Sequence, residues 1–171
     1  MEGVVIMFNN IYKNCNVLVT GHTGFKGSWL VLWLQMLGAK VTAISLPPET
    51  SPNHWNLLGL DIDSYHIDIR DEVSLRRTIM EIQPKMVFHL AAQPLVRASY
   101  SLPLETFNTN IMGTAHVLDA LRGLDGVLAA VMVTTDKVYR NNEWSWAYRE
   151  DDVLGGHDPY SASKAASELI I

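Results

Sequence analysis

The sequence lacks several features that would assign it to a particular compartment or partner class. Its 171 residues include one cysteine, Cys15, so no internal disulfide can form and the chain suits a reducing cytoplasm. Lysine and arginine number 13 against 18 aspartates and glutamates, and no basic run occurs, which argues against nucleic acid and membrane partners. The longest apolar stretch, 29–37, is interrupted by Gln35 and is far shorter than the roughly 20 residues of a membrane span.

Metal-ligand spacing and sequence repeats are missing as well. His22, His89, His116 and His157 have no partners that suggest a metal site, and we interpret them as structural residues. Hydrophobic residues make up 48% and charged residues 18% of the chain, which is the balance of a folded protein. We expect residues 1–16 to be an N-terminal extension, with no basic leader of a secretory signal, and residues 17–171 to be one domain.

Short β-rich runs alternate with helical patterns along this domain. Alternation of this kind, with apolar strands, predicts a parallel sheet covered by helices on both faces. We therefore expect an α/β fold, a doubly wound, Rossmann-like sheet of about five strands. The expected strands are 17–20, 41–45, 64–68, 86–90 and 127–134, and the expected helices are 24–37, 71–82, 103–122 and 160–171.

A glycine-rich turn follows the first expected strand. Glycines at intervals of three allow backbone N–H groups to approach a pyrophosphate at the start of a helix, where the helix dipole adds favourable charge. In this position the pattern predicts a dinucleotide site, although a simple strand-to-helix turn has the same glycines. We expect Trp29 and Trp33 of the following helix to be core residues. The expected cradle consists of Gly21, Thr23, Gly24, Phe25, Lys26 and Gly27.

The choice of cofactor is less marked in the sequence. The second strand of a dinucleotide fold usually ends with an acid for the ribose, or lies near an arginine for a 2′-phosphate. Here it ends Ala43-Ile44-Ser45-Leu46-Pro47, with neither, and Glu49 follows on a proline-containing loop. We expect NAD, with NADP left open by this segment.

Two groups of polar residues are candidates for catalysis. Tyr160 and Lys164 are four apart, which on a helix places their Cβ atoms about 5 to 6 Å apart and predicts a phenol with a lowered pKa. Such a pair also occurs by chance on solvated helices. Thr135, Asp136 and Lys137 follow the last strand at the edge where doubly wound folds bind ligands, as a substrate hydroxyl contact, a general acid, and a base or charge. A polar turn after a strand would have the same composition.

Several segments together resemble the extended short-chain dehydrogenase/reductase family, and within it the N-terminal half of the CDP-glucose 4,6-dehydratases. The Gly-Phe-Lys-Gly-Ser-Trp run and the Glu-Trp-x-Trp segment are more specific than the shared dehydrogenase motifs. The resemblance extends from Val17 to Ile171 and is carried by 21–30, 89–97, 135–137, 142–150 and 155–164.

The resemblance implies a three-stage reaction with NAD on CDP-glucose. Tyr160, its pKa lowered by Lys164 and the oxidised nicotinamide, would take the C4 hydroxyl proton while hydride leaves for NAD, and Thr135 would bind the same oxygen. Asp136 would then assist loss of the C6 hydroxyl as water, before hydride returns to C6. TDP-glucose dehydratases have Glu as the C5 base where this chain has Lys137, so the identity of that base stays open.

The resemblance also assigns further contacts and partners. Gln93, Arg97 and Thr135 would face the sugar nucleotide, and helices near 103–122 and 160–171 would form a homodimer. The implied setting is cytoplasmic deoxysugar synthesis for lipopolysaccharide O-antigen. Asp68, which could equally be a surface acid, and Ile69 would lie near the adenine, and the other implied cofactor contacts are Leu90, Ala91, Ala92, Gln93, Asn110, Tyr160 and Lys164.

In that family the substrate-binding half follows the part that this chain resembles. We therefore expect the nucleotide-sugar site to be incomplete in these 171 residues. Two alternatives stay open: an inactive dinucleotide-binding module or truncated gene product, and a different nucleotide-sugar dehydratase or epimerase.

Overall fold

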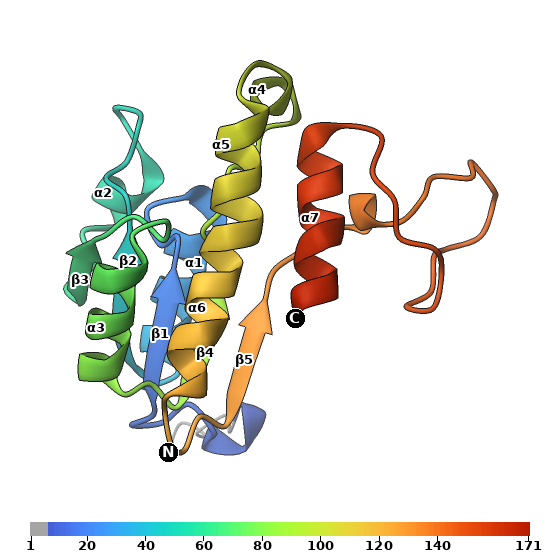
Figure 1. The fold of residues 1–171 in the computed structure, drawn as a ribbon. Coiled ribbons are helices and arrows are strands. Elements are labelled where there is room, and N and C mark those ends of the chain that lie inside the picture. The colour runs from blue at the N-terminus through green and yellow to red at the C-terminus, as the bar shows by residue number, and fades with distance from the viewer. Residues whose placement is uncertain (1–6) are drawn as a thin grey trace.

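Five parallel strands form one sheet in the computed structural model, which describes residues 7–171 (Figure 1). Their order is β3-β2-β1-β4-β5, so the chain turns back between β1 and β4, as expected for a doubly wound fold. The α/β prediction is confirmed. The strands are β1 Asn16–Thr20, β2 Lys40–Ser45, β3 Asp63–His66, β4 Met86–His89 and β5 Ala129–Met132.

Most helices begin and end close to the predicted positions. The segment predicted as one helix over 103–122 is divided by a π-helical turn, and two short helices, α2 and α4, were not predicted. The helical elements are η1 Phe8–Asn10, α1 Phe25–Met36, α2 His54–Leu58, α3 Glu72–Ile82, α4 Val96–Ser101, α5 Pro103–Phe107, the π turn η2 Asn108–Met112, α6 Gly113–Arg122, η3 Asp136–Val138 and α7 Pro159–Ile170.

Side chains that alternate in direction along the strands form two hydrophobic cores, one on each face of the sheet. Leu18 points to one face, where it packs with α3 and α6, and its neighbours Val17 and Val19 point to the other, where they pack with α1. Figure 1 shows α3 and α6 together on one side of the sheet. Both faces are therefore covered at the central strands, which matches the continuous apolar runs of the sequence.

Trp29 and Trp33 do not lie in the core, contrary to the prediction. Their side chains are 50% and 46% exposed, because α1 turns Val31 and Leu34 toward the sheet and leaves the tryptophans on its flank. Trp33 packs against Phe8 with a ring distance of 5.7 Å, and Trp29 packs against another ring described below. Residues 1–6 of the expected N-terminal extension lie outside the described residues.

Helix α7 begins at a capping aspartate followed by a proline, a sequence that is typical of helix starts. Asp158 accepts a hydrogen bond from the backbone N–H of Ser161, and Pro159 occupies the first helical position. The helix stands beside β5 and packs against α4 and α5 (Figure 1). This fixed start determines which face of α7 Tyr160 and Lys164 occupy.

Candidate active site

A cavity of about 1020 Å³ opens at the carboxyl edge of the sheet. Residues that follow β1, β2, β3, β4 and β5 line it, as expected for a sheet of this topology. It contains most of the predicted cofactor residues. Those that line it are Gly21, Thr23, Gly24, Phe25, Lys26, Gly27, Asp68, Ile69, Leu90, Ala91, Ala92, Gln93, Tyr160 and Lys164.

Five predicted residues do not line this cavity. Arg97, Asp136 and Lys137 are exposed outside it. Thr135 lies at the start of η3, where its hydroxyl donates to Asp136 Oδ1 at 3.1 Å. Asn110 is buried beneath the cavity wall, with 1% of its surface exposed. The structure thus brings the cofactor residues together and leaves the Thr135 to Lys137 segment at the rim.

The first glycine of the cradle has the backbone that only glycine adopts readily. Gly21 has φ of 78°, and a Cβ there would lie 2.6 Å from the backbone nitrogen of Ala91. Gly27 packs so closely on the carbonyl of Gly21 that a Cβ would overlap it. These contacts bring the turn, the start of α1 and the end of β4 together around one opening.

At the end of β2, hydroxyl groups occupy the place of the usual acid. Thr23 Oγ1 donates to the Leu46 carbonyl at 2.9 Å, and it lies 2.7 Å from Ser45 Oγ. With the Thr23 proton used in this way, Ser45 donates to Thr23 and keeps its lone pairs free. Lone pairs at this wall suit a ribose hydroxyl, and Glu49 also lines the cavity.

A flanking aromatic cluster explains where Trp29 lies. The ring of His54 on α2 lies 4.6 Å from that of Trp29 and 5.3 Å from that of Phe25, and its Nδ1 lies 2.5 Å from Ser28 Oγ. His54 and Phe25 both line the cavity. The unpredicted helix α2 therefore closes the cavity over the start of α1.

A buried histidine connects the cradle strand to the neighbouring helix. Thr114 Oγ1 donates its proton to the Asn110 carbonyl at 2.7 Å and so accepts from His89 Nε2, which leaves His89 Nδ1 to accept from the Thr20 hydroxyl at 2.7 Å. His89 then carries its proton on Nε2 and donates to Thr114 Oγ1 at 3.1 Å. Burial, followed by the nearby charge of Lys164, lowers the pKa of His89 to about 3. It is a neutral structural residue, as we interpreted it.

Asn110 binds the protein, where a cofactor contact was expected. Its Oδ1 accepts from the N–H of Gln93 at 2.8 Å, and its Nδ2 donates to the Gln93 carbonyl at 3.1 Å and to Ser163 Oγ at 2.8 Å. The π turn also directs the Asn110 carbonyl toward Ser167, whose hydroxyl donates to it at 2.9 Å. Asn110 thus joins the cavity residue Gln93 to α7, the helix that carries Tyr160 and Lys164.

Tyr160 and Lys164 both face the cavity, but the expected electrostatics differ. Lys164 Nζ donates to the Val133 carbonyl at 2.8 Å, and burial lowers its pKa while Glu168 opposes that change. Burial raises the pKa of Tyr160, a hydrogen bond with Thr135 opposes the increase, and Asp158 and Asp136 add to it. The predicted lowering of the Tyr160 pKa is therefore wrong for this geometry, since burial disfavours the phenolate, the Lys164 ammonium binds a carbonyl and two acids lie near the phenol.

Sequence reasoning missed three charged residues near the cavity. Glu168 accepts a hydrogen bond from Thr134 Oγ1 at 2.5 Å, and it lies one helical turn after Lys164. Arg70 and Glu105 line the cavity beside Asp68. The spacing of Arg70, two residues after Asp68 at a strand end, was the available signal.

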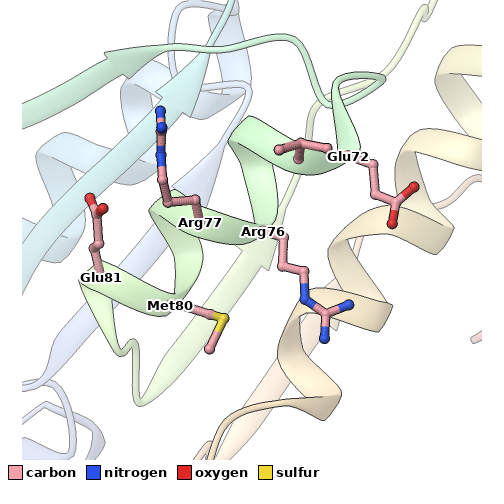
Figure 2. A pocket seen from close by; sticks show the side chains of 6 residues that line it. Glu72, Arg76, Arg77, Met80 and Glu81 are labelled. Carbon is pink, nitrogen blue, oxygen red and sulfur yellow. The ribbon is translucent and has the colours of Figure 1, made fainter.

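A second, shallow hollow of about 460 Å³ lies on the outer face of α3 (Figure 2). All its lining residues come from this one exposed helix, and Arg76 is paired with Asp119 at 2.7 Å. No chemistry follows from it. Within residues 7–171, no helix is long and apolar enough to cross a membrane, and no group of three His, Cys, Asp or Glu could hold a metal ion.

Comparison with known proteins places this arrangement among nucleotide-sugar enzymes. Residues 18–171 match the family model described as GDP-mannose 4,6 dehydratase. CDP-glucose 4,6-dehydratase of Salmonella typhimurium is 50% identical over 163 residues, which are 94% of this chain and 45% of that protein. The chain spans about half the length of the curated relatives that it matches.

Solved structures agree on the fold. An epimerase from Methanothermobacter thermautotrophicus has a TM-score of 0.80 at 29% identity, with 94% of this chain and 47% of that chain covered. UDP-glucose 4-epimerase of Thermus thermophilus, solved in complex with NAD, has a TM-score of 0.75 at 29% identity, with coverage of 90% and 48%.

Proposed function

This chain belongs to the GDP-mannose 4,6 dehydratase family, and from that premise we propose that it binds NAD and takes part in the 4,6-dehydration of CDP-glucose. The observation that carries the proposal is one cavity lined by both the glycine cradle and the Tyr160–Lys164 pair. The 50% identity to a CDP-glucose 4,6-dehydratase supports the choice of substrate.

The residues present fit NAD. The cavity lies against the glycine turn and the start of α1, where a pyrophosphate would bind, and the Thr23 and Ser45 hydroxyls provide acceptors for a ribose. NAD would supply a hydride acceptor that returns its hydride within the same turnover. The neutral end of β2 and the identified relatives favour NAD over NADP.

The chain's own residues would move the protons. Tyr160 would accept the C4 hydroxyl proton, and Thr135, which lies near the Tyr160 phenol, would hold the same oxygen. Asp136 would protonate the departing C6 hydroxyl. The C4 ketone makes the C5 proton acidic, and Lys137, as an uncharged amine, is our candidate for the base that removes it. For Tyr160 to act near neutral pH, its raised pKa must fall, and the positive charges of the oxidised nicotinamide and of the Lys164 ammonium, turned from Val133 toward the phenol, would lower it.

Completion of this reaction is proposed to need regions of the relatives that this chain does not match. Asp136, Lys137 and Arg97 lie outside the described cavity, which favours a second candidate, a dinucleotide-binding module without turnover of its own. Epimerization is a third candidate, because the solved structures include UDP-glucose 4-epimerases. An epimerase needs no acid for water loss, so the Asp136-Lys137 pair favours dehydration.

One experiment separates these candidates. The chain is incubated with CDP-glucose and NAD, and the product is assayed for the ultraviolet absorbance of a 4-keto sugar in base, while calorimetry measures NAD binding. We expect NAD to bind and turnover to be absent or slow in this chain. Rapid turnover would refute the expected incompleteness, CDP-galactose as product would favour epimerization, and absence of NAD binding would refute the proposed function.

The finer assignments belong to the same proposal. We propose a homodimer formed through α5, η2, α6 and α7, on which apolar side chains are exposed, among them Leu104, Met112 and Leu169. We also propose a cytoplasmic enzyme whose 4-keto-6-deoxy product serves deoxysugar synthesis, including that of lipopolysaccharide O-antigen.

A further inference from the structure

Glu168 lies on α7 one helical turn after Lys164, outside the motifs that the sequence identifies. Its Oε1 accepts a hydrogen bond from Thr134 Oγ1 at 2.5 Å. Val133, the residue before Thr134, provides the carbonyl that accepts from Lys164 Nζ at 2.8 Å. The segment that follows β5 is therefore bonded to α7 twice, once through the Glu168 carboxylate and once through the Lys164 ammonium.

The Lys164 ammonium is a buried charge with a single neutral acceptor. Lys164 is 5% exposed, and among residues 7–171 its Nζ donates a hydrogen bond to the Val133 carbonyl alone. Burial of an ammonium disfavours its charged form unless an opposite charge lies nearby. Burial accordingly lowers the pKa of Lys164, and Glu168 opposes this change.

Glu168 is placed to act on Lys164 in a way that other nearby charges are not. Residues four apart on a helix lie on one face, with Cβ atoms about 5–6 Å apart, and the bond to Thr134 restricts the rotation of the carboxylate. Glu168 is the charged group that raises the pKa of Lys164. Further titratable groups at the start of α7 and on the elements packed against it, α4, α5 and η3, include Asp158, Tyr160, Arg97, Glu105, Asp136 and Lys137.

We propose that Glu168 is a positioning residue whose carboxylate, held by Thr134, supplies the negative charge that keeps the Lys164 ammonium charged beside Tyr160. The inference rests on the proposed function, in which that ammonium helps to make the phenol a base. Glu168 takes no part in the reaction itself and acts through Lys164. Since its charge is decisive, an amide in the same place keeps an acceptor for Thr134 but loses the effect on Lys164.

The test follows the Lys164 ammonium in the protein without ligand. Lysines are isotope-labelled at the ε-carbon, NMR spectra at a series of pH values give the titration of each ammonium, and Lys164→Met identifies the Lys164 signal. We expect Glu168→Gln to weaken the proton affinity of Lys164 at least about threefold. Glu168→Asp, which keeps the charge, should restore that affinity to within about twofold of the unchanged protein.

Glu81→Gln is the matched control. It removes the same charge from an exposed position on α3, outside the cavity that Lys164 lines (Figure 2), and should leave the Lys164 titration unchanged. An equal effect of Glu81→Gln and Glu168→Gln would overturn the inference, because net charge alone would then account for it. An unchanged Lys164 titration in Glu168→Gln would also overturn it, as would a Glu168→Asp protein that titrates like Glu168→Gln.

If circular dichroism shows that Glu168→Gln does not fold, the double variant Thr134→Val with Glu168→Met decides. It removes both partners of the hydrogen bond, so neither polar group is left unpaired. The same loss of at least about threefold is expected, and an unchanged titration contradicts the inference. Because the measurement needs no NAD, a failure of NAD binding by calorimetry would overturn the proposed function separately.

Discussion

Gly21 connects local backbone geometry with the proposed binding of NAD. Its φ of 78° disfavours any other residue, and a Cβ would lie 2.6 Å from the Ala91 nitrogen. We expect Gly21→Ala to lower the free energy of unfolding by about 2–4 kcal/mol and to weaken NAD binding at least tenfold, because the turn must move off β4. Chemical denaturation and calorimetry measure the two effects.

Gly59→Ala is the control for backbone strain alone. Gly59 has φ of 56°, but a Cβ there would meet nothing within 4 Å. This variant should lose about 1 kcal/mol of stability and keep its NAD affinity. If Gly21→Ala behaved in the same way as Gly59→Ala, the close contact with Ala91 would have no role in the cradle.

Because two histidines are buried in their neutral form, we predict that the free energy of unfolding falls as soon as the pH drops below 6.5, before the carboxylates titrate. Burial lowers the pKa of His89 to about 3 and that of His22 to about 4, from 6.5 in each case. Both stay neutral in the folded state, so below pH 6.5 the unfolded chain binds more protons and unfolding becomes easier. Their full contribution is present above pH 6.5 and is lost as the pH falls.

The expected slope is up to about 1.4 kcal/mol per pH unit for each histidine, between pH 6.5 and about 5. Urea denaturation at a series of pH values measures this slope. His89→Gln should remove the contribution of one histidine, so the slope should fall by up to about half. A free energy of unfolding that stays constant across this interval would contradict the buried neutral state of both rings.

At the scale of elements, the sequence predicts the long periodic segments and misses what depends on tertiary contacts. The alternation of strands and helices follows from hydrophobic periodicity, which is clear over the length of α3 or β1. Helices α2 and α4 have five and six residues, too few to repeat a pattern. Burial of Trp29 was wrongly predicted because a helix with apolar residues on several sides does not reveal which face meets the sheet.

The candidate site also contains some features that the sequence predicts and others that depend on tertiary contacts. Glycine spacing and the Tyr160–Lys164 spacing are local, so the sequence can identify them. The bond from Lys164 to the Val133 carbonyl joins residues 31 apart, and no local pattern encodes it. The raised pKa of Tyr160 likewise depends first on burial and then on Asp158 and Asp136, and η3, which carries Asp136, meets α7 only through tertiary packing.

Asn110, in the π turn η2, provides a test of how tertiary hydrogen bonds hold the elements together. Asn110→Ala removes the partners of the Gln93 N–H, the Gln93 carbonyl and Ser163. With buried polar groups left unpaired, we expect the free energy of unfolding to fall by about 2–4 kcal/mol. NAD affinity should also decrease, since Gln93 lines the cavity. Denaturation and calorimetry measure the two changes.

Asn108→Ala in the same turn provides the comparison. Asn108 is exposed, so its substitution should change stability by less than about 0.5 kcal/mol and leave NAD binding unchanged. Equal effects of the two substitutions would mean that the turn itself, rather than the hydrogen bonds of Asn110, fixes α7.

At the scale of the whole molecule, two neighbouring helices each expose a large apolar side chain that a partner could cover. Leu104 on α5 and Leu169 on α7 are 80% and 76% exposed, and the two helices pack side by side (Figure 1). Two copies related by a twofold axis would place these helices against their equivalents. Burial of several such side chains would stabilise the pair by about 1.5–3 kcal/mol each, within the limits set by the entropy of association.

Leu169→Glu tests this arrangement. We expect the unchanged protein to sediment as a dimer and Leu169→Glu to sediment as a monomer, because the proposed interface would bury two unpaired carboxylates, one from each copy. Val73→Glu is the matched control: Val73 is 77% exposed against 76% for Leu169, but it lies on α3 away from α5 and α7. Since both substitutions add the same charge at equally exposed positions, only a loss of association specific to Leu169→Glu supports the interface. A dimer that persists in Leu169→Glu, or an unchanged protein that is monomeric, would contradict it.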